Sequence, residues 1–180
     1  RASATCEVRI VDGEDREVSR GEVGEIVARG PIVMLGYWNM PEATAEATRG
    51  GWMHTGDLGR MDADGYVTVI DRLKDMIITG GENVYSAEVE NALSSHPDVA
   101  NVAVIAAPDE TWGERVHAVI VPRPGTSPTP ESLTAHCRGL IAGFKLPRSF
   151  DFIDALPLSA AGKVQKNVLR ERAQALAAEV

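Results

Sequence analysis

The chain has 180 residues, of which 44% are hydrophobic, and this is enough to bury a core in one large or two small domains. This composition excludes a disordered chain, and no apolar run reaches the roughly 20 residues that a membrane-spanning helix needs. The net charge of −8 argues against general nucleic-acid binding, although residues 138–180 carry seven basic and four acidic side chains. The chain begins with polar residues and without Met, so we expect no signal peptide and a piece of a longer protein.

The first 71 residues are predicted to form short strands joined by turns. Strands are indicated over residues 6–11, 23–29 and 66–71, because β-branched residues alternate there between Gly, Pro and Asp turn signals. Residues 41–48 begin with Pro and are rich in Ala and Glu, which predicts a short helix. This pattern is typical of part of a small barrel or sheet.

From residue 76 the pattern changes to alternating strands and helices. Strands are predicted over residues 76–79, 99–107, 116–121 and 150–153, and helices over residues 87–95, 131–141 and 167–179. Ser86 is the predicted N-cap of the first of these helices. The alternation predicts a compact α/β unit. We place the boundary near residues 72–75, where charged residues are typical of a hinge.

The two cysteines, Cys6 and Cys137, are far apart and share no spacing with other metal ligands. This argues against a zinc site. We expect both to be reduced, partly buried thiols of a cytoplasmic protein.

Three short motifs carry groups that could bind a ligand. In Thr55-Gly56-Asp57 a carboxylate follows a Gly, where it could accept hydrogen bonds from both hydroxyls of a ribose; a purely structural turn is the alternative. Arg72 is either a second ligand of that nucleotide or the surface partner of Asp71 or Asp75.

The other two motifs lie after the predicted boundary near residues 72–75. Gly80-Gly81 is either a tight turn before the Ser86 helix or a place where a slender ligand passes along the backbone. Lys163 follows Gly162 and is either a solvated side chain or a compact positive charge for a reacting phosphate.

The order of these motifs resembles the C-terminal part of the adenylate-forming superfamily, which includes acyl-CoA synthetases, luciferases and peptide-synthetase adenylation domains. The resemblance rests on residues 51–59 (GWMHTGDLG), 64–66 (DGY), 71–77 (DRLKDMI), 80–85 (GGENVY) and 162–163 (GK), together with residues 21–26 (GEVGEI) and 36–38 (GYW).

The resemblance implies roles for four residues in the activation of a carboxylic acid by ATP and Mg²⁺. Asp57 would bind the ribose hydroxyls of ATP or AMP, and Arg72 would assist there. Lys163 would be the catalytic lysine that stabilises the attack of the carboxylate on the α-phosphate. Lys74 would be the hinge about which the C-terminal domain turns between two half-reactions.

The resemblance also implies a binding site for coenzyme A. Gly80 and Gly81 would face the thiol-bearing arm after the domain turns. Phe144, Lys145 and Arg148 would hold the nucleotide end of CoA, and Trp112 would be a further aromatic contact of CoA.

We therefore expect an α/β (α+β) protein in which residues 1–73 end the large adenylating domain, as part of a β-barrel subdomain, and residues 74–180 form a mobile lid domain. The parent would be an AMP-forming acid–thiol ligase of fatty acid metabolism, using ATP, CoA and a carboxylic acid. The phosphate loop and most of the acid pocket of the family are absent from the 180 residues, so the chain alone is predicted to be inactive. Two alternatives are an adenylation domain that loads a carrier protein and a non-catalytic lid or interaction module.

Overall fold

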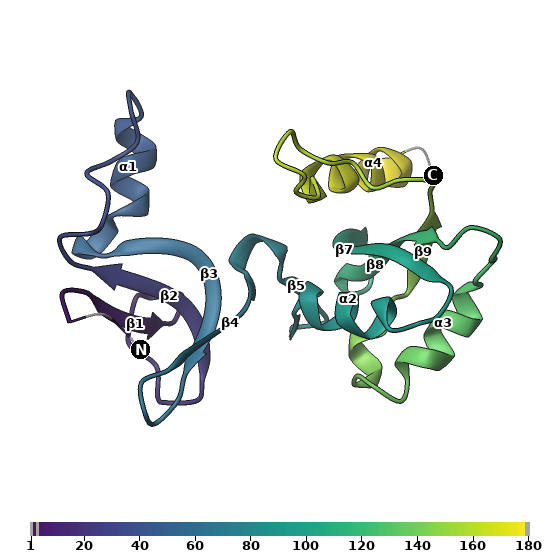
Figure 1. Ribbon diagram of the computed structural model, residues 1–180, viewed down its shortest axis with the longest axis horizontal. Helices are drawn as coiled ribbons and strands as arrows, with labels where there is room; N and C mark the ends of the chain where they lie inside the picture. Colours follow the sequence, from purple (N-terminus) through teal and green to yellow (C-terminus); the bar gives the residue numbers. More distant parts are fainter. Residues whose placement is uncertain (1, 3, 179–180) are drawn as a thin grey trace. The chain divides into compact units, whose positions relative to one another are not determined.

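The computed structural model describes residues 2 and 4–178 and divides the chain into two compact units, Arg1–Lys74 and Asp75–Val180 (Figure 1). The fold is mixed α/β, as predicted, with a mainly antiparallel sheet in each unit and four α-helices among the described residues. In this described part, no helix has the length and apolar character needed to cross a membrane.

The first unit is a four-stranded antiparallel sheet with the strand order β1-β2-β3-β4. Its strands are β1 (Glu7–Val11), β2 (Val23–Arg29), β3 (Met53–Met61) and β4 (Val67–Arg72), and the short helix α1 (Pro41–Ala47) precedes β3. Three of these strands and the helix are confirmed to within one residue. Strand β3 is not predicted, because Gly56, Asp57 and Gly59 interrupt the alternation that identifies a strand.

The second unit has the strand order β6-β5-β8-β7, and β9 pairs in parallel with β8. The strands are β5 (Ile77–Thr79), β6 (Glu82–Val84), β7 (Val99–Asp109), β8 (Gly113–Pro122) and β9 (Ser149–Phe152). The helices are α2 (Ser86–Ser94), α3 (Pro130–Cys137) and α4 (Lys166–Ala178). Residue 179 of the predicted last helix lies outside the described residues.

Helices cover both faces of this second sheet (Figure 1). On one face, Val104 and Ile120 pack in a buried cluster with residues of α2 and α3. On the other face, Ala103 and Ile105 pack against Leu169 of α4. Because successive strand residues point to opposite faces, the continuous apolar runs of β7 and β8 supply both clusters, as their composition predicts.

Around α2 one prediction is confirmed in part and one is wrong. Gly80-Gly81 forms a tight turn, as one of the two alternatives predicted, but it is the turn of the β5–β6 hairpin, and the unpredicted strand β6 lies between it and α2. Ser86 is the first residue of α2, whose N-cap is Tyr85. The Ser86 hydroxyl is buried and accepts a hydrogen bond of 2.8 Å from Lys166 Nζ, so it ties α4 to α2 instead of capping the helix.

Helix α3 is shorter than predicted and ends at Cys137. A capping box formed by Thr129 and Ser132 starts it. Both cysteines are free thiols, as predicted; Cys6 is partly exposed and Cys137 is buried. Burial raises the pKa of the Cys137 thiol, which favours an inert packing role.

Candidate functional site

Asp57 and Arg72 face each other across the antiparallel pair of β3 and β4. Arg72 Nε lies 3.2 Å from Asp57 Oδ1, and the side chains are 57% and 34% exposed. The backbone N–H of Arg72 donates to Asp71 Oδ1 at 2.7 Å, so Asp71 orients the chain here while Asp57 holds the guanidinium. An exposed pair of this kind adds little stability, so a ligand could replace either partner at small cost.

The irregular part of β3 that carries Asp57 is held by hydrogen bonds on both sides. Gly56 has φ of 69°, in the left-handed region that favours glycine, and its N–H donates to Glu25 Oε1 at 2.9 Å. Thr55 Oγ1 donates to the carbonyl of Ile26 at 2.7 Å and accepts from the N–H of Asp57 at 3.1 Å. Sequence reasoning missed Glu25, although a carboxylate inside a β-rich run was a signal for it.

Lys74 lies close to Thr55 and Gly56 in space, although β4 separates it from them in sequence. It belongs to the 3₁₀ turn η2 (Leu73–Asp75), which directly follows β4. A shallow cavity of about 340 Å³ is lined by Thr55, Gly56, Arg72, Leu73 and Lys74. The structure thus brings the predicted ribose-binding residues and the predicted hinge residue to one place in the first unit.

In the second unit, Gly80, Trp112 and Arg148 form one stack. The N–H of Gly80 donates to the carbonyl of Trp112 at 3.0 Å, and the indole ring packs against Gly80. Arg148 Cζ lies 4.6 Å from the centroid of that ring, a cation–π distance. Gly81 has no atom within 4 Å of the position that a side chain would take, so this edge of the hairpin is open.

Phe144 and Lys145 lie in the 3₁₀ turn η3 (Gly143–Lys145). Phe144 is 42% exposed. The Lys145 ammonium donates to both carboxylate oxygens of Glu88, at 2.8 and 2.7 Å. A phosphate would therefore have to compete with Glu88 for Lys145.

Lys163 is in an exposed loop closed by a bridge between Leu158 and Val164. Its backbone N–H donates to Ser159 Oγ at 3.1 Å, and Gly162 takes φ of 75° in the same turn. Within the described ranges the Lys163 ammonium makes no ion pair.

Two other basic residues of the C-terminal segment are paired with acidic ones. Lys166 Nζ lies 2.7 Å from Glu90, and Arg170 contacts Asp75. These two basic side chains therefore form ion pairs within the second unit.

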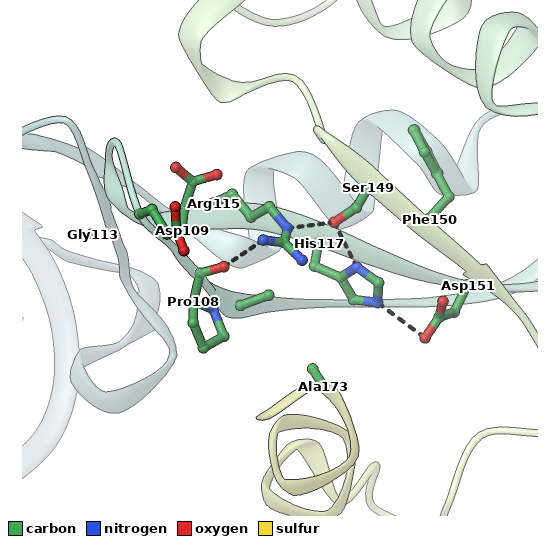
Figure 2. A pocket seen from close by; sticks show the side chains of 11 residues that line it. Pro108, Asp109, Gly113, Arg115, His117, Ser149, Phe150, Asp151 and Ala173 are labelled. Carbon is green, nitrogen blue, oxygen red and sulfur yellow. Dashed lines mark hydrogen bonds and ion pairs between the residues drawn. The ribbon is translucent and has the colours of Figure 1, made fainter. Parts of the chain in front are cut away.

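The structure also contains a pocket that sequence reasoning missed, since its central histidine lies inside an apolar run. It has a volume of about 610 Å³ and lies beside β7, β8, β9 and α4 (Figure 2). Arg115 Nε donates to Ser149 Oγ at 3.0 Å, and Ser149 Oγ is 2.8 Å from His117 Nδ1. His117 Nε2 lies 3.3 Å from Asp151 Oδ2. Burial lowers the pKa of His117, and the Asp151 carboxylate opposes that effect.

Comparison with known proteins connects these features to a family. The profile of the AMP-binding enzyme C-terminal domain matches residues 88–163. The chain is 48% identical to the fatty acid–[acyl-carrier-protein] ligase ScoC of Streptomyces coeruleorubidus, over 91% of this chain and 32% of ScoC. It is 51% identical to a feruloyl-CoA synthase of Amycolatopsis sp, over 92% of this chain and 34% of that enzyme.

A solved structure extends this likeness to the fold. ATP-bound MatB from Rhodopseudomonas palustris superposes with a TM-score of 0.88 at 42% identity, over 95% of this chain and 34% of MatB. The chain spans about a third of the length of the curated relatives it matches. The chain belongs to the adenylate-forming superfamily and corresponds to the C-terminal part of its members.

Proposed function

We propose that the chain is the C-terminal part of an AMP-forming carboxylic acid–CoA ligase. The observation that carries this proposal is the Asp57–Arg72 ion pair, in which Arg72 lines the same cavity as Lys74. A carboxylate on a bulged strand next to an open cavity suits the two hydroxyls of a ribose, and the guanidinium suits a neighbouring oxygen. The family membership supports ATP as the source of that ribose.

In the first half-reaction, the substrate carboxylate attacks the α-phosphorus of ATP, and the bond to the β-phosphate oxygen breaks. An acyl-adenylate forms and pyrophosphate leaves. Negative charge builds up on the phosphate oxygens in the transition state, so an unpaired ammonium such as that of Lys163 stabilises it. Mg²⁺ would enter with ATP; among residues 2 and 4–178 no group of three or more His, Cys, Asp or Glu could hold a metal ion by itself.

In the second half-reaction, the thiol of CoA attacks the acyl carbonyl, the thioester forms and AMP leaves. We propose that rotation about Lys74, the last residue of the first unit, withdraws Lys163 and presents the Gly80-Gly81 turn. The open side of Gly81 leaves room for the pantetheine arm. Trp112, Arg148 and Phe144 offer exposed aromatic and cationic groups for the nucleotide end of CoA. A cytoplasmic location, expected from the two thiols, belongs to the same proposal.

A carrier protein is a second candidate acceptor. The name of ScoC, at 48% identity, specifies an acyl-carrier-protein acceptor instead of CoA. The phosphopantetheine of a carrier protein has the same thiol arm as CoA but lacks its adenine nucleotide. Substitutions at Trp112 and Arg148 would therefore distinguish the two acceptors, because only the nucleotide of CoA would contact these residues.

The experiment uses the full-length enzyme that contains this segment. We expect exchange of labelled pyrophosphate into ATP that depends on a carboxylic acid, and a thioester when CoA is added. Exchange without a CoA thioester, but with acyl transfer to a carrier protein, would favour the second candidate. No exchange with any of a broad panel of fatty and aryl acids would overturn the adenylating function. The 180-residue chain alone is expected to give no exchange.

A further inference from the structure

Residues 55–57 form a bulge in the sheet of the first unit. Strand β2 pairs Glu25 with Leu58 and Val27 with His54, so the three residues of β3 between them stand opposite Ile26 alone. Bulges of this kind leave backbone groups without ladder partners and redirect a side chain. The backbone here needs other acceptors to hold its shape.

Glu25 supplies one of those acceptors from inside the sheet. The residue is only 7% exposed, and Oε1 accepts the N–H of Gly56 at 2.9 Å. Gly56 has a left-handed backbone and no side chain to anchor it, so this hydrogen bond restricts the most flexible residue of the bulge.

The second oxygen of Glu25 is equally engaged. Oε2 lies 2.8 Å from Nδ1 of His54 and 3.3 Å from the guanidinium of Arg49, which also bonds Asp15 at 3.2 Å. Charge-assisted hydrogen bonds in a buried network are stronger than exposed ones, so the carboxylate has one well-defined position. Because the carboxylate is fixed, its hydrogen bond fixes the position of Gly56 and, through the bulge, that of Asp57.

Glu25 does not line the cavity beside Asp57, whereas Thr55 and Gly56 do. It therefore acts through the bulge and not on a ligand. We propose that Glu25 is a positioning residue that aims the Asp57 carboxylate at the ribose hydroxyls of ATP. This inference rests on the proposed function, which gives Asp57 its ligand.

The first test measures the bulge itself, in the 180-residue chain, by amide hydrogen exchange. In Glu25→Ala the N–H of Gly56 loses its acceptor, and we expect its exchange to become about tenfold faster, as the loss of one hydrogen bond implies. The matched control is Glu22→Ala on the same segment; Glu22 is exposed and its carboxylate accepts the N–H of Ser19 at 2.9 Å, so Gly56 should be unaffected. Unchanged exchange of Gly56 in Glu25→Ala overturns the proposal.

The second test measures ribose recognition in the full-length enzyme, with 3′-deoxy-ATP as the probe. Wild type should prefer ATP to 3′-deoxy-ATP in acid-dependent adenylation, and Asp57→Asn should lose most of that preference. Glu25→Ala should raise the KM for ATP about tenfold and that for 3′-deoxy-ATP much less, with kcat for both little changed. A general loss of structure would instead raise the KM for both nucleotides by the same factor, and that result overturns the positioning role.

Glu25→Gln keeps the shape of the side chain and one carbonyl oxygen for Gly56. It should restore most of the preference for ATP, which guards against a Glu25→Ala variant that does not fold. One result overturns the positioning role alone: wild type prefers ATP, Asp57→Asn loses that preference, and both Glu25 variants keep it. If wild type shows no preference and Asp57→Asn has no effect, the ribose role of Asp57 in the proposed function fails and the positioning role falls with it.

Discussion

The indole ring of Trp112 fills the space that a side chain at Gly80 would occupy. A Cβ built on Gly80 would lie 2.5 Å from Cε3 of Trp112, closer than real carbon atoms approach. Gly80 also has φ of 60°, and Gly81 has φ of 84°, so both residues of the hairpin turn use a left-handed backbone. Gly80 therefore meets two requirements, whereas Gly81 meets only the conformational one.

We predict that Gly80→Ala destabilises the chain more than Gly81→Ala. Each substitution places Ala in a left-handed backbone, at a cost of about 1 kcal/mol. Gly80→Ala must also displace the Trp112 ring, which adds about 1–3 kcal/mol of overpacking. Urea denaturation of the two variants measures the difference, with Gly81→Ala as the matched control. Equal free energies of unfolding would show that the ring moves away freely.

The relation between Gly80 and Trp112 also marks the limit of what the sequence could predict. Strands β7 and β8 could be predicted from their apolar runs, because such a run is visible in consecutive residues of the sequence. The contact between Gly80 and Trp112 depends on how β5 is placed beside β8, and no local pattern carries that information. The same holds for Ser86, which resembles an N-cap in sequence but bonds Lys166 of α4.

The candidate site divides in the same way. Asp57, Arg72 and Lys74 could be proposed because their motifs resemble a family; in the structure Arg72 and Lys74 line one cavity, and Asp57 pairs with Arg72. Glu25 and His117 were not predicted as site residues, because each is a single polar residue inside a strand. Only the partners that the fold brings to them, such as Gly56 and Ser149, distinguish them from residues of an ordinary strand.

The pairing of Lys145 with Glu88 leads to a prediction about CoA. In the full-length enzyme, Glu88→Gln should lower the KM for CoA several-fold, because it releases the Lys145 ammonium for a phosphate and removes a negative charge. Its effect on the free energy of unfolding should stay within about 1 kcal/mol, since Glu88 is 38% exposed. Glu171→Gln, an exposed carboxylate of α4, makes the same charge change and is the control. An unchanged KM for CoA in Glu88→Gln would separate Lys145 from CoA binding.

Lys163 and Lys166 should respond to substitution in opposite ways. Lys163 is exposed and unpaired within the described chain, so Lys163→Ala should leave the thermal midpoint nearly unchanged. It should lower acid-dependent pyrophosphate exchange by about 10²–10³-fold, the usual cost of losing one group that stabilises transition-state charge. Thioester formation from supplied acyl-adenylate should be spared.

Lys166→Ala provides the matched comparison. It breaks a partly buried pair with Glu90 and the hydrogen bond to Ser86, so it should destabilise the second unit by about 1–3 kcal/mol. Differential scanning calorimetry measures the stability of both variants, and pyrophosphate exchange measures their adenylation activity. If Lys163→Ala damages both half-reactions equally, Lys163 does not belong to the first step alone.

His117 should make the stability of the chain depend on pH. Burial lowers its pKa in the folded state, whereas in the unfolded chain it titrates near its ordinary value of about 6.5. Below about pH 6.5 the unfolded state therefore binds more protons than the folded state, and the free energy of unfolding falls as the pH falls. Above that pH both states are neutral at His117, and this contribution to the pH dependence disappears.

The comparison of wild type with His117→Gln isolates this effect, since the other titrating groups are common to both. The free energy of unfolding of wild type relative to His117→Gln should decrease from pH 7.5 to pH 5, by at most about 1.4 kcal/mol per pH unit. Asp151→Asn removes the carboxylate that raises the pKa of His117, so in this variant the pKa falls further and the loss continues to lower pH. Urea titrations at several pH values measure all three proteins. A difference that does not change with pH would mean that His117 binds its proton equally well in both states, through relaxation of Asp151 toward Nε2 or entry of water into the pocket.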